Sequence, residues 1–127
     1  MLEMVAVLTQ RETIELDSEK LVDLYRQLGD AAAEDVVCRA MEELALRLAH
    51  TEKLYRRHQR QEMRKSARLI VAIAEQVGMQ LLAKVAIDVT VCIDHGDEAA
   101  LAAVLSRLVR IGERSLTEVW DLQDLSI

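Results

Sequence analysis

The chain has 127 residues, which suits one domain, and 51% of them are apolar, so it can bury a core and is not expected to be disordered. A net charge of −6 argues against a protein that mainly coats nucleic acid or an anionic membrane. Proline and phenylalanine are absent and 2% of the residues are aromatic, which nearly excludes an all-β fold and predicts an all-helical domain.

The first two predicted helices meet at Gly29. Asp17 and Ser18 are suited to cap a short helix that Gly29 ends, as the residue after its last turn. Asp30 can cap the next helix, in which apolar residues recur at intervals of three and four as far as Tyr55.

A third helix is predicted to end at Gly78. Its apolar positions alternate spacings of four and three and predict one buried face: Met63, Ala67, Ile70, Ala74 and Val77. A fourth helix is predicted from about Met79 to Asp94 and stops at Gly96. Asp97 can cap the fifth helix.

Two segments have a second interpretation. Nothing between Thr51 and Lys65 must break a helix, so the second and third helices could form one rod, although the polar residues 56–60 suit a turn. Residues 87–94 alternate apolar and polar side chains as a strand does, but a lone strand would leave backbone groups unpaired, so a helix is favoured. The predicted architecture is all-α: an antiparallel four-helix bundle with a short N-terminal helix packed at one end.

The predicted helices define a single domain over residues 1–127. Residues 1–13 are expected to form a loosely ordered arm, and the core is expected to cover about residues 14–122. No apolar run approaches the roughly 20 residues that span a bilayer, and the start lacks the basic region of a signal peptide, so a cytoplasmic location is expected. Cys38 and Cys92 are expected to be buried free thiols. No Gly-rich phosphate loop or Cys/His cluster occurs, so neither a metal nor a cofactor is expected.

Residues 68–78 read R-L-I-V-A-I-A-E-Q-V-G, and this segment resembles a known signature. The histidine-containing phosphotransfer (HPt) domain carries H-x-[LIV]-K-G-S-[AS]-x-x-[LIV]-G on one helix. Four positions agree with it: Ile70, Ala74, Val77 and Gly78. With the turn at Gly96 and Asp97, the resemblance spans about residues 14–112. It implies a four-helix bundle from a bacterial phosphorelay.

The same alignment shows what this chain lacks. Arg68 stands at the position of the phosphoryl-accepting histidine, and Val71 replaces the lysine. Ala72 and Ile73 replace the glycine and the serine. An arginine is always protonated and has no lone pair that could attack a phosphoryl group. The resemblance therefore implies a degenerate HPt-like bundle that has lost its nucleophile.

None of the three histidines has the signature around it. Gln61 stands where a lysine would be needed after His58, which is expected to lie in a turn. His50 has no residue placed to orient its imidazole, and His95 falls at a helix C-terminus, where it would interact with the helix dipole. Surface structural histidines are favoured, and phosphotransfer through His58 stays an open alternative.

Helical geometry predicts which side of the third helix faces outward. At about 100° per residue, Arg68 lies away from the apolar face. Its neighbours on that side complete the candidate partner-binding surface: Arg64, Lys65, Ala72 and Glu75. Between residues 53 and 68 there are seven basic residues and one acidic residue, so this segment carries +6 and the rest of the chain −12. Such a run is either a solvated face or a surface that attracts an acidic partner.

The favoured function is a non-enzymatic HPt-like bundle that binds a signalling partner. The resemblance implies an acidic receiver domain as that partner. The first alternative is a homodimeric module without a phosphorelay role, with the broad apolar arc of the fourth helix, Trp120 and Leu122 as its interface. The second is a nucleic-acid-associated protein that uses residues 53–68, although Tyr55 is the one aromatic residue there that could stack on a base. No carboxylate is forced into the apolar interior, so catalysis has no comparable support.

Overall fold

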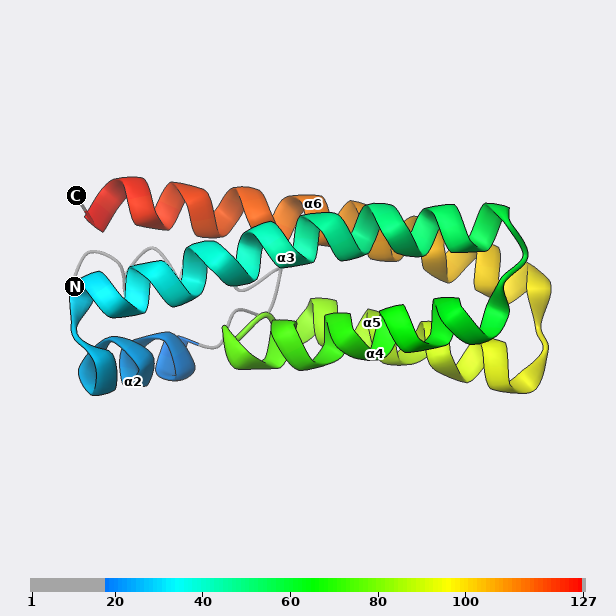
Figure 1. Cartoon of the computed structure of the whole chain (residues 1–127), viewed down its shortest axis with the longest axis horizontal. Helices are drawn as coiled ribbons and strands as arrows, with labels where there is room; N and C mark the ends of the chain where they lie inside the picture. Colours follow the sequence, from blue (N-terminus) through cyan, green and yellow to red (C-terminus); the bar gives the residue numbers. More distant parts are fainter. Residues whose placement is uncertain (1–17, 127) are drawn as a thin grey trace.

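The computed structural model describes residues 18–126, which form five α-helices (Figure 1). The helices are α2 (Ser18–Leu28), α3 (Asp30–Arg56), α4 (Arg60–Gln76), α5 (Gln80–His95) and α6 (Glu98–Ser126). No strand occurs in this part of the chain, so the all-helical prediction is confirmed. The predicted arm and Asp17 lie outside the described residues.

The four longer helices lie along the long axis of the molecule (Figure 1). α3 packs against α4 and α6, and α5 also packs against α4 and α6. α2 packs against the first part of α3, beyond the end of α4 (Figure 1). Lys20 Nζ donates a hydrogen bond to the backbone carbonyl of Glu75 (2.8 Å), which joins α2 to the end of α4.

The core is built from the apolar faces that the residue spacing indicates. All five predicted positions on the third predicted helix are completely buried: Met63, Ala67, Ile70, Ala74 and Val77. Leu82 and Val89 of α5 and Leu101 and Leu108 of α6 are buried in the same core. This agreement confirms the face assigned to α4.

Residues 57–59 separate α3 from α4, so the interpretation as one continuous rod is wrong. Gln59 N–H donates to the carbonyl of Leu54 (3.0 Å), and His58 N–H donates to that of Tyr55 (3.0 Å), which closes the end of α3. His58 has φ 57°, a left-handed conformation that is uncommon for a residue other than glycine. Residues 87–94 belong to α5, as favoured above, and Gly96 ends it in the left-handed region.

One predicted cap is correct and another is wrong. Ala100 N–H donates to Asp97 Oδ1 (3.0 Å), so Asp97 caps α6 as expected. Asp30 is instead the first residue of α3, and Gly29 occupies the cap position with φ 80°. A single residue links α2 to α3, so the carbonyl that accepts from Ala33 N–H is that of Gly29 (3.0 Å). The acidic side chain of Asp30 still lies in the first turn, where the helix dipole favours it.

Candidate functional site

A groove of about 350 Å³ lies between α4 and α5. Its lining consists of Arg64, Arg68, Val71, Ala72, Glu75, Ile87 and Thr90. Four of the five residues predicted for partner binding therefore come together at one place. The fifth, Lys65, does not line the groove, and its Nζ lies 3.5 Å from Glu62 Oε1 on the same helix. We call this feature the α4–α5 groove.

Helix periodicity explains why these side chains share the α4–α5 groove. The five lining residues of α4 fall at intervals of three, four or one, which places them along one strip of the helix. α5 contributes Ile87 and Thr90, three residues apart. Val71 is half-buried and Ile87 is 44% exposed, so the groove offers apolar surface beside charged side chains.

Arg64 is held by α5 at the edge of the α4–α5 groove. Its Nε lies 2.7 Å from Asp94 Oδ1 and its Nη2 3.1 Å from Asp94 Oδ2. These hydrogen bonds raise the pKa of the Arg64 guanidinium and hold the pKa of the Asp94 carboxyl below its ordinary value. Arg64 was predicted to be available to a partner, but its charge is already matched by Asp94.

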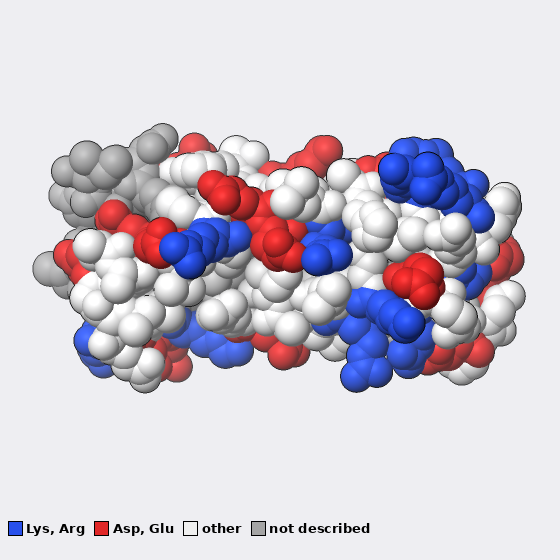
Figure 2. All heavy atoms as spheres, in the orientation of Figure 1, with Lys and Arg blue, Asp and Glu red and all other residues white. Residues whose placement is uncertain are grey.

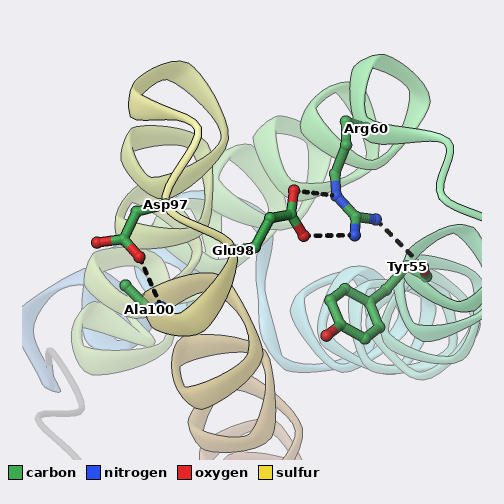
Figure 3. A network of polar contacts seen from close by, with 5 residues as sticks. All are labelled: Tyr55, Arg60, Asp97, Glu98 and Ala100. Carbon is green, nitrogen blue, oxygen red and sulfur yellow. Dashed lines mark hydrogen bonds and ion pairs between the residues drawn. The ribbon is translucent and has the colours of Figure 1, made fainter.

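Arg60 is paired in the same way, but with α6. Its Nε and Nη2 donate to the two carboxylate oxygens of Glu98 (3.0 and 2.7 Å), and its Nη1 donates to the carbonyl of Tyr55 (3.1 Å) (Figure 3). The hydrogen bond to Arg60 lowers the pKa of the Glu98 carboxyl. The guanidinium carbon also lies 4.7 Å from the centroid of the Tyr55 ring. One face of that ring is therefore occupied, which weakens the nucleic-acid alternative.

Arg68 differs from both of these arginines. It is exposed, as predicted, and makes no hydrogen bond or ion pair within residues 18–126. Basic side chains gather over the C-terminal end of α3 and over α4 (Figure 2). Arg60 and Arg64 are paired with other helices, and Lys65 is paired with Glu62 on its own helix. The unpaired positive charge of residues 53–68 therefore comes from four residues: Lys53, Arg56, Arg57 and Arg68. Of these four, Arg68 lines the α4–α5 groove.

The interface suggested for a homodimer is not available on α5. Four residues of the apolar arc are buried in the core: Leu82, Val85, Ala86 and Val89. Periodicity identifies an apolar face but not the surface that packs against it, so the sequence alone could not show that other helices of the same chain cover this arc. Trp120 is 49% exposed, and the side chain of Leu122 lies outside the described residues.

The histidines and cysteines lie mostly at the surface. His58 is exposed in the turn after α3, as expected, and His50 and His95 are also exposed. Both cysteines are free and half-buried, so the prediction that they are buried is only partly correct. Burial, followed by the nearby Asp97 and Asp88, raises the pKa of the Cys92 thiol, which keeps the thiol protonated.

A buried polar contact was not anticipated from the sequence. The hydroxyls of Thr51 on α3 and Ser66 on α4 lie 2.7 Å apart, and Thr51 Oγ1 also donates to the carbonyl of Arg47 (2.7 Å). Thr51 is completely buried and Ser66 nearly so. The spacing of the apolar residues could have indicated that Thr51 is buried, because Thr51 follows Leu48 by three residues on the apolar face of its helix. This pair fixes α3 against α4 rather than forming a reactive site.

The described part of the chain offers neither a metal-binding cluster nor a helix that could span a membrane. Among residues 18–126, no three His, Cys, Asp or Glu side chains are grouped so that they could hold a metal ion. None of the helices found there has both the length and the apolar character needed to cross a bilayer. Comparison with protein-family models, curated proteins and solved structures finds no match to this chain.

Proposed function

We propose that this chain is a non-catalytic helical adaptor that binds an acidic signalling partner through the α4–α5 groove. The resemblance to HPt domains implies a receiver domain as that partner. One observation carries the proposal: Arg68 is exposed and unpaired, and it lines a groove that also offers apolar surface. An unpaired guanidinium beside apolar side chains suits a carboxylate flanked by apolar residues.

We also infer that α3 to α6 form an antiparallel four-helix bundle with α2 packed at one end. Each of these four helices contacts the next one in the chain, and α3 contacts α6, which supports a closed ring of helices. Such a bundle would hold α4 and α5 side by side as a rigid platform. The α4–α5 groove would then need little rearrangement when a partner binds.

The charge available for docking is concentrated in one side chain. The ion pairs of Arg60 and Arg64 hold neighbouring helices together, so a partner would have to break them before using those charges. Arg68 makes no such ion pair within residues 18–126, and its charge contributes less than that of Arg64 to the lowered pKa of the Asp94 carboxyl. Across a partly desolvated interface, a matched charge contributes about 1 kcal/mol or somewhat more. Arg68 should therefore act as a binding hot spot.

The test is a binding titration against receiver domains of the source organism, with the wild type and with Arg68→Glu. The charge reversal should weaken binding by about tenfold to a hundredfold and reduce its dependence on salt, since about 1.4 kcal/mol is a factor of ten. Arg107→Glu is the matched control, because Arg107 is exposed on α6 and does not line the groove. Equal affinities of the wild type and Arg68→Glu would refute the proposal.

The same samples test the absence of phosphotransfer. After incubation with acetyl phosphate or a phosphorylated receiver, the protein should carry no acid-labile phosphate, because the position that aligns with the nucleophile is Arg68. A phosphohistidine at His58 would show that phosphotransfer persists through the turn after α3. In that case the adaptor would be an active phosphotransfer protein.

A further inference from the structure

The outward face of α3, together with the residue that follows the helix, carries a regular strip of exposed residues. Spacings of three and four place them within about 80° of the helix circumference, at about 100° per residue. We call this set the α3 strip: Asp35, Glu42, Leu46, His50, Lys53 and Arg57, with Arg39 among them. All are exposed, and the strip lies on different helices from the α4–α5 groove.

Leu46 lies at the centre of the α3 strip. It is 68% exposed, whereas the next most exposed large apolar side chains of the described residues are Trp120 at 49% and Leu28 at 46%. Ala45 and Ala49 beside it are also exposed, and their small side chains allow another helix to approach closely. A solvated polar face does not require an apolar centre of this kind.

Charges of opposite sign lie on either side of Leu46. Within the α3 strip, the half before Leu46 carries Asp35, Arg39 and Glu42, with a net charge of −1. The half after Leu46 carries Lys53 and Arg57, with a net charge of +2. Acidic side chains lie over the first half of α3 with basic ones between them, and a larger basic cluster lies over its C-terminal end (Figure 2). A surface with this distribution is complementary to itself after a rotation of 180° about Leu46.

We propose that the α3 strip is the interface of an antiparallel homodimer, with Leu46 beside the two-fold axis. The axis pairs positions equally distant from residue 46, so Asp35 faces Arg57 of the second copy, and Glu42 faces its His50. Arg39 faces Lys53 of the second copy, which brings two positive charges near each other. Arg39 lies 3.2 Å from Asp35 within its own chain, and this ion pair partly offsets the charge of Arg39. Lys53 and Arg57 make no ion pair within residues 18–126, and dimerisation brings acidic side chains near them.

Sedimentation equilibrium over a range of protein concentrations tests the dimer. The wild type should approach twice the mass of the chain as its concentration rises. Leu46→Glu should weaken self-association by at least about a hundredfold, because it brings two carboxylates together at the axis. Leu69→Glu is the control, because Leu69 is 45% exposed but lies on α4. A wild type that stays monomeric, or a Leu46→Glu variant that dimerises normally, overturns the proposal.

A charge exchange tests the pairing within the dimer. Asp35→Arg should weaken self-association, because it places an arginine opposite Arg57 of the second copy. The double variant Asp35→Arg/Arg57→Asp should recover most of the loss, since the exchange restores opposite charges at the same positions. Circular dichroism of each variant confirms that the helices are retained. Failure of the double variant to recover association overturns this pairing.

Disulfide cross-linking tests the direction of the two helices. In a Cys38→Ala/Cys92→Ala background, Leu46→Cys should oxidise to a covalent dimer, because the two positions meet at the axis. Lys53→Cys should not, since its two copies lie about 21 Å apart along the helices and a disulfide needs Cα atoms within about 7 Å. Cross-linking through Lys53→Cys, or none through Leu46→Cys, overturns the antiparallel arrangement.

Discussion

At the residue scale, the hydrogen bond between Thr51 and Ser66 is the clearest internal polar contact. Thr51→Val keeps the shape of the side chain but leaves the Ser66 hydroxyl buried without its partner. The free energy of unfolding should fall by about 1–2 kcal/mol. Urea denaturation followed by circular dichroism measures this change.

The matched variant removes both hydroxyls. Thr51→Val/Ser66→Ala leaves no unpaired polar group at this position, so it should be more stable than Thr51→Val alone. A double variant that loses the sum of both single effects would show that the two hydroxyls act independently. That result would contradict a role for the pair in holding α3 against α4.

The Arg64–Asp94 ion pair gives a dependence on pH. The pKa of the Asp94 carboxyl is lower in the folded protein than its ordinary value, chiefly through the hydrogen bond from Arg64. The ionised carboxylate therefore stabilises the fold above the unfolded-state pKa, and this contribution is lost as the pH falls through the folded-state pKa. Wild type should be slightly more stable than Arg64→Gln at neutral pH, and the difference should shrink as the pH falls below the ordinary pKa of an aspartate and through the lowered pKa of Asp94.

Urea midpoints at several pH values measure this difference. Arg107→Gln is the control, because Arg107 is an exposed arginine that makes no ion pair within residues 18–126. Other carboxyl groups titrate in the same range, so the comparison between variants carries the information. A difference between wild type and Arg64→Gln that stays constant from neutral to acid pH would contradict the pairing.

At the element scale, α3 and α6 approach each other at Gly112. A Cβ atom at this position would lie 2.5 Å from Leu48 Cδ1, too close for two non-bonded carbon atoms, so the Leu48 side chain would have to shift. Gly112→Val should therefore lower the free energy of unfolding by about 1–3 kcal/mol through overpacking. Thermal or urea unfolding measures the change.

The control for Gly112→Val lies on the exposed side of the same helix. Ala103→Val places the same side chain in solvent and should cost about half a kcal/mol through helix propensity. Equal effects at the two positions would show that α3 and α6 are not in close contact at Gly112. Gly112 would then be an ordinary helix glycine.

Local pattern predicted the elements well. Apolar spacing identified the buried face of α4, including Ile70, and the polar residues 56–60 marked the turn after α3. The position of Asp30 was wrong by one residue, because Gly29 alone links α2 to α3 and takes the cap position. Such errors arise where the length of a connection, rather than the preference of a residue, decides where a helix begins.

At the scale of the whole molecule, the sequence could not separate paired charges from unpaired ones. The partners of Arg60 and Arg64 are 38 and 30 residues away in the chain, on other helices. Periodicity places both arginines on a surface, but only the packing of α4 against α5 and α6 brings Glu98 and Asp94 to them. The basic segment is thus partly a set of contacts between helices, and Arg68 is the charge it leaves for the α4–α5 groove.

Amide chemical-shift mapping tests most directly whether the α4–α5 groove is the docking surface. An unlabelled receiver domain is added to the ¹⁵N-labelled protein, and the shifted amides are assigned. The largest shifts should fall on the residues that line the groove, among them Arg68, Ala72, Ile87 and Thr90. Shifts confined to α3 or α6, with these four amides unchanged at saturation, would contradict the account.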